Sequence, residues 1–246
     1  MRRGKSVMGI CGELIKYIIA AGLPLMVKEG DENKLSASFN DLRRMDMTRM
    51  NLFPVFAFPV ILLIGILLIP VNPDYNDHAL ALQAVEQVGR WFTGHLVSAI
   101  AFSFAVWATR EILGLLTRAP WYTLIFIAAG AGLYSAGMGV DGIAPVAIMT
   151  SGASALVFFD GSGWWVSGVF MAGTLSFALG LFIIIGNAIQ AKLVEGVWRY
   201  VIFVSALVFV SAPAVPSGWA LYGVGLAALG IFIPLGVSMQ RKYTSA

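Results

Sequence analysis

The feature that most constrains this chain is the near-absence of charge between Leu52 and Met239. Long apolar runs interrupted by a few polar residues are typical of membrane spans, because only a hydrocarbon solvent accepts so much apolar surface. Across the chain 59% of residues are hydrophobic and 12% are charged, whereas an ordinary soluble domain has roughly a quarter of its residues charged. The sequence therefore predicts an all-α, polytopic transmembrane helical bundle.

Six spans give the most economical threading of the apolar part. We expect them at residues 52–70, 91–115, 121–140, 164–189, 198–212 and 219–239. Tryptophan marks the start of most of these spans, as expected for side chains that anchor a helix at the membrane surface. The chain then divides into a cytoplasmic or interfacial segment at 1–50 and a transmembrane bundle at 51–246.

The distribution of charge predicts how the bundle is oriented. Of the 16 lysines and arginines, only Arg90 falls outside when the N-terminus is placed in the cytoplasm. The loops on the outer side instead carry five acidic residues, Asp74, Asp77, Glu86, Asp141 and Asp160. Cytoplasmic loops of membrane proteins carry an excess of basic residues. We therefore expect both termini in the cytoplasm and the bundle in the cell (inner) membrane.

Two apolar stretches do not fit as ordinary spans. Residues 9–27 include Glu13 and Lys16 and have too short an uncharged run to cross a bilayer, so they predict an amphipathic helix at the cytoplasmic interface. Residues 143–159 follow closely on the third span, and a full span here would invert everything downstream. We interpret 143–159 as a re-entrant or interfacial segment on the outer side, entered through 139–142 and left through 160–163, with a full span as the open alternative.

Small residues recur at helix-contact spacing in two of the predicted spans. The third span has Ala128, Gly132 and Ala136, and the fourth has Gly168, Ala172, Ser176 and Gly180. Spans associate through close packing, and stripes of small side chains permit it. We expect these stripes to pack within the chain; contact with a partner subunit is the alternative.

Ionisable residues inside spans are candidates for function, because burying them without a partner is costly. His95 lies about one turn inside the outer end of the second span, and Asp141 marks the outer end of the third. The matching depths would allow a hydrogen bond between the two side chains. A hydrated Asp141 and a His95 that only packs are the favoured interpretation. His95 and Asp141 form the candidate polar site of the outer face.

A second group of polar residues lies in the loop after the first span. Asp74, Asp77 and His78 offer two carboxylates and an imidazole, which are the kinds of ligand that bind a divalent metal ion. Aspartate near proline is also an ordinary turn residue, so a plain polar loop explains the same pattern.

Several functional classes are excluded by what the sequence lacks. The single cysteine, Cys11, rules out a cysteine-based metal site, and no stripe of basic and aromatic residues suggests nucleic-acid binding. No catalytic residue or cofactor is identified. The sequence favours a non-catalytic accessory or scaffold subunit of a larger membrane complex, with the bilayer and other membrane proteins as partners. A small-solute transporter or channel with a pocket near His95 and Asp141, and an outer-face metal-dependent enzyme, are the alternatives.

Overall fold

The computed structural model describes residues 51–116 and 119–244 of the chain. In order, the elements are α3 (Phe53–Leu68), α4 (His78–Val85), α5 (Val88–Leu115), α6 (Tyr122–Thr150), α7 (Leu156–Gln190), α8 (Trp198–Ser211), the short 3-10 helix η2 (Ala212–Ala214) and α9 (Gly218–Thr244). The described residues form helices and no strands, and a helix occupies each of the six predicted positions. The predicted interfacial helix at 9–27, with Cys11, lies outside the described residues.

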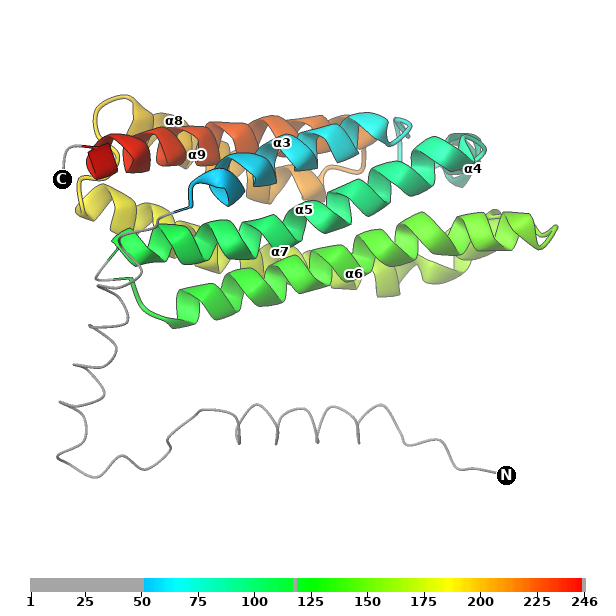
Figure 1. Ribbon diagram of the computed structural model, residues 1–246. Helices are drawn as coiled ribbons and strands as arrows, with labels where there is room; N and C mark the ends of the chain where they lie inside the picture. Colours follow the sequence, from blue (N-terminus) through cyan, green and yellow to red (C-terminus); the bar gives the residue numbers. More distant parts are fainter. Residues whose placement is uncertain (1–50, 117–118, 245–246) are drawn as a thin grey trace, which may run out of the picture. The chain divides into compact units, whose positions relative to one another are not determined.

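The long helices run side by side and alternate in direction along the chain (Figure 1). α5 packs between α3 and α6, and α6 packs against α7. α9 packs against α3 and α8. We call the end of the bundle that holds α4, the α6–α7 turn and η2 the α4 end, and the opposite end, where α9 finishes, the C-terminal end. The candidate site residues all lie at the α4 end.

Four of these helices, α5, α6, α7 and α9, are long and apolar enough to cross a membrane. They indicate an integral membrane protein. α3 and α8 are apolar but shorter, with 16 and 14 residues. At 1.5 Å per residue these two helices reach about 24 Å and about 21 Å, whereas the hydrocarbon core of a bilayer is about 30 Å thick.

Aromatic rings fill the centre of the bundle. Phe58 of α3 contacts Phe232 of α9 with ring centroids 4.8 Å apart, and Phe102 of α5 stacks on Tyr134 of α6 at 4.6 Å. Phe177 of α7 packs edge-on against Phe102 at 6.0 Å. These side chains are almost completely buried. The long helices are therefore joined through one main apolar core, and a second, smaller apolar cluster lies at the α4 end.

Residues 143–159 form the tip of a helical hairpin in place of the expected re-entrant segment. α6 continues to Thr150, and α7 begins at Leu156 after a short turn. The glycines and aspartates at 139–142 and 160–163, which predicted loops, lie inside these two helices. A continuous helix satisfies its own backbone hydrogen bonds, and at least one of these glycines, Gly142, is used for a close helix contact.

The prediction that both small-residue stripes pack within the chain is wrong for α6. Ala128, Gly132 and Ala136 are all exposed, and a Cβ atom at Gly132 would meet nothing within 4 Å. The opposite face of α6 is the packed one, where a Cβ at Gly130 would lie 2.6 Å from the backbone nitrogen of Phe177. Apolar residues surround this helix, so the hydrophobic pattern does not indicate which face is buried.

The α7 stripe is confirmed in part. Ser176 donates a hydrogen bond to the carbonyl oxygen of Phe126 at 2.9 Å, and Gly180 lies against Ile127. Ala172 is exposed, and a Cβ at Gly168 would have no neighbour within 4 Å. In this part of α7, Gly173 makes the contact with α6, close to the Gly130 carbonyl.

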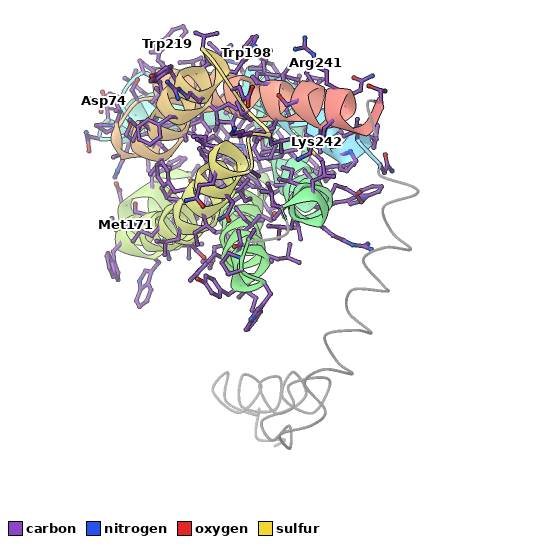
Figure 2. The ribbon with its side chains drawn as sticks, turned by 90° about the vertical axis from the view of Figure 1, so that its left-hand side faces the viewer. Asp74, Met171, Trp198, Trp219, Arg241 and Lys242 are labelled. Atoms are coloured by element: carbon purple, nitrogen blue, oxygen red, sulfur yellow. The ribbon has the colours of Figure 1, made fainter. Side chains whose placement is uncertain are left out.

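The acidic and basic side chains labelled in Figure 2 lie on different sides of the surface, and large apolar side chains are exposed on the long helices. Figure 2 shows Asp74 on the side of the molecule opposite Arg241 and Lys242, with Met171 directed away from the bundle. Met171 and Trp219 are both well exposed, as are Trp164 and Trp165 on α7. Exposed apolar side chains of this size are expected where a helix faces lipid.

Candidate functional site

The structure brings His95 and Asp141 together at the α4 end. His95 Nε2 lies 3.3 Å from Asp141 Oδ2. Both residues sit on long helices, His95 on α5 and Asp141 on α6, and these helices are packed along their length. The structure therefore has the contact that their matching depths allow, and His95 is not only a packing residue.

Trp91 completes this group, one helical turn before His95. Its indole Nε1 donates to the backbone oxygen of Asp141 at 2.8 Å, and its own backbone oxygen accepts from His95 Nδ1 at 2.7 Å. The two rings lie 4.5 Å apart. Trp91 is 3% exposed and His95 4%. The Asp141 side chain keeps 25% exposure, so solvent reaches the group from the aspartate.

Sequence reasoning missed two residues of this group. Trp91 is one of the tryptophans expected to anchor a span at the membrane surface, yet the structure buries it between helices. Gly142 was interpreted as part of a loop, but a Cβ there would lie 2.6 Å from Cβ of His95. The spacing of Trp91 and His95 by four residues is the one signal that places both on the same face of a helix.

The three candidate metal ligands do not converge. Asp77 caps α4 by accepting from the backbone nitrogens of Ala79 and Leu80. Asp74 accepts from the backbone nitrogen of Asn76 at 2.9 Å. In the described part of the chain, no three side chains of histidine, cysteine, aspartate or glutamate gather as metal ligands.

His78, the third candidate, makes a separate pair with Asp160 of α7. Its Nδ1 lies 2.6 Å from Asp160 Oδ1, and the two side chains are 39% and 67% exposed. This contact ties α4 to the tip of the hairpin. The α4 end therefore has two histidine–aspartate pairs, one exposed and one largely buried.

Tyr75, in the loop before α4, lies close to a residue of each pair, Asp141 and His78. The pKa of its phenol is raised, mainly because neighbouring atoms displace water from the hydroxyl group. The negative charge of Asp141 is the second cause. Part of the residue stays exposed to solvent. Tyr75 also lines a hollow of about 400 Å³ with His78, Ser167 and the segment after α8. The hollow is not lined by His95 or Asp141.

The chemistry available at this end is limited. An imidazole beside a carboxylate can join two helices through a hydrogen bond and can bind a proton. Tyr75 remains a neutral phenol at physiological pH, since its pKa is raised from an already high value. Comparison with known proteins adds no assignment: no protein-family model, curated protein or solved structure matches this chain.

Proposed function

We propose that this protein is a non-catalytic accessory or scaffold subunit of a larger membrane complex, and that the exposed small-residue face of α6 binds a transmembrane helix of another chain. The observation that carries this proposal is the position of Ala128, Gly132 and Ala136. These residues follow one another every fourth position and are all exposed. Such a face lets the backbone of a second helix approach closely.

The remainder of α6 supports the choice of this face. The buried face already contacts α7 through Gly130 and α5 through Gly142. The exposed stripe is smooth, and Gly132 and Gly139 both leave open space where a side chain would stand. In a bilayer, helices gain little from apolar contact alone, so close packing is what selects a partner.

The proposed topology has six spans and two cytoplasmic termini. The four long helices cross the membrane, and α3 and α8 cross it with the help of adjoining residues or local thinning of the bilayer. The α4 end carries Asp74, Asp77, Glu86, Asp141 and Asp160 and would face outward. The C-terminal end carries Arg110, Lys192, Arg199, Arg241 and Lys242 and would face the cytoplasm, in agreement with the excess of basic residues on that side.

Site-specific photo-crosslinking in the native membrane tests the proposed face. A benzophenone amino acid replaces Ala136 on the stripe, and in a matched variant it replaces Leu226, which is 62% exposed on α9. We expect the variant at 136 to form a product with a different chain and the variant at 226 to form none. Crosslinking only between two copies of this chain, or equal crosslinking at both positions, would contradict the proposal.

A further inference from the structure

The hydrogen bonds of His95 fix where one of its ring protons lies. Nδ1 is 2.7 Å from the backbone oxygen of Trp91. A carbonyl oxygen only accepts hydrogen bonds, so the proton of this contact belongs to Nδ1. A neutral imidazole carries one N–H proton, and in His95 the contact with Trp91 uses it.

The other ring nitrogen then faces Asp141 without a proton of its own. Nε2 lies 3.3 Å from Asp141 Oδ2. An ionised carboxylate also only accepts, so a neutral ring would direct its lone pair at a negatively charged oxygen. We propose that His95 and Asp141 form a proton-binding site, in which one additional proton is held between Nε2 and Oδ2.

The exposed pair at the same end of the bundle, His78 and Asp160, can form its hydrogen bond with a neutral imidazole. His78 meets Asp160 through Nδ1, at 2.6 Å. Within the described part of the chain, no hydrogen bond is recorded for Nε2 of His78. A neutral ring with its proton on Nδ1 satisfies this contact without an additional proton. The two pairs therefore differ in the number of protons they need, although they contain the same residue types.

The side chains around His95 and Asp141 determine from which side a proton can reach the pair. The His95 side chain is 5% exposed and that of Asp141 is 25% exposed, so exchange with solvent passes through the aspartate. From the loop before α4, the neutral phenol of Tyr75 lies near Asp141. On α5 itself, the guanidinium group of Arg90 donates a hydrogen bond to the side-chain oxygen of Gln87 at 2.9 Å, so its recorded contact is with Gln87 and not with the pair.

Other charged groups lie at this end: α4 is followed by the exposed Glu86, and Asp74 and Asp77 accept hydrogen bonds from backbone nitrogens at and before the start of α4. α4 and α7 present His78 and Asp160, which contact each other. The end of α3 approaches the neighbouring turn of α5 through Ile69 against Gly94, and Ile69 does not titrate.

Binding of this proton would control the contact between α5 and α6. With the proton present, Nε2 and Oδ2 are joined by a hydrogen bond beside the close approach of Gly142 to His95. Without it, the lone pair of the ring and the carboxylate repel each other, which weakens the contact at this point, although the hydrogen bond from Trp91 to the backbone oxygen of Asp141 remains. This inference does not depend on the proposed role as a subunit.

Nitrogen NMR of the intact protein in lipid nanodiscs, labelled with ¹⁵N-histidine, tests the proposal. The chain has two histidines, so a His78→Gln variant assigns the signals of His95. At neutral pH we expect both ring nitrogens of His95 to carry protons or, if the proton lies on Asp141, a carboxylic-acid carbonyl band in the infrared spectrum. Asp141→Asn should abolish that imidazolium signal or carbonyl band, because the asparagine amide can donate to Nε2 itself. Asp160→Asn, the matched control, should leave it unchanged.

Two results would overturn the proposal. One is a wild-type His95 that carries a single ring proton at neutral pH while Asp141 gives no carboxylic-acid band. The other is an imidazolium signal that survives in folded Asp141→Asn protein, since the proton would then not depend on the pair. Circular dichroism of each variant establishes that it is folded.

Discussion

The two faces of α6 carry the same kinds of small residue, but only one face uses them for contacts within the chain. On the buried face, a Cβ at Gly130 would lie 2.6 Å from the backbone of Phe177, and one at Gly137 would lie 2.9 Å from the ring of Phe170. On the exposed face, Gly132 has open space around it. Glycine is thus required on one face by contacts within the chain. On the other face nothing in this chain requires it, which is why we assign that face to a partner.

The largest effect is expected from branched side chains placed on the two faces. Gly130→Val puts new atoms against the backbone of α7, which cannot move aside as a side-chain tip can. Overpacking of a core costs about 1–3 kcal/mol, and we expect the upper end of that range. Gly132→Val should leave the free energy of unfolding within about 0.5 kcal/mol of wild type. Thermal or denaturant unfolding in mild detergent, followed by tryptophan fluorescence, measures both. Equal destabilisation by the two variants would remove the distinction between the faces.

An intermediate effect is expected where α6 meets α5. Gly142→Ala places a methyl group against Cβ of His95, and we expect a loss of about 2 kcal/mol in unfolding free energy. Gly139→Ala, three residues earlier on α6, meets nothing and should be neutral or stabilising by up to about 1 kcal/mol, because alanine favours a helix over glycine. The same unfolding assay compares them. A Gly142→Ala protein as stable as Gly139→Ala would show that the α5–α6 contact is looser than described.

The sequence predicted the helices better than it predicted their faces. Apolar runs and tryptophans placed a helix at all six positions, because length and hydropathy alone determine where such segments lie. The contact between His95 and Asp141 was the less favoured interpretation of the sequence, because a hydrated aspartate at the end of a span needs no partner, yet the structure has the contact. The packed face of α7 was predicted in part, through Ser176 and Gly180. The packed face of α6 was not, because α6 is apolar all round and both sides carry small residues at similar spacing.

The residues that sequence reasoning misjudged share one cause. Gly142 and Trp91 were assigned by their local preferences, glycine for loops and tryptophan for membrane surfaces. In the structure both are determined by contacts with residues about 50 positions away along the chain, Gly142 with His95 and Trp91 with Asp141. Such contacts leave no periodic signal in a single sequence.

The central claim is that the exposed face of α6 binds another chain, and the mass of the complex purified in mild detergent from its native membrane tests it most directly. Wild type should elute with a second membrane protein. Gly132→Leu should weaken that association at least about tenfold, or 1.4 kcal/mol, and be recovered folded and alone. Gly186→Leu, which adds the same side chain in open space on α7, should elute as wild type does. A wild-type protein recovered as a single folded chain, or a Gly132→Leu protein that keeps its partner, would contradict the account.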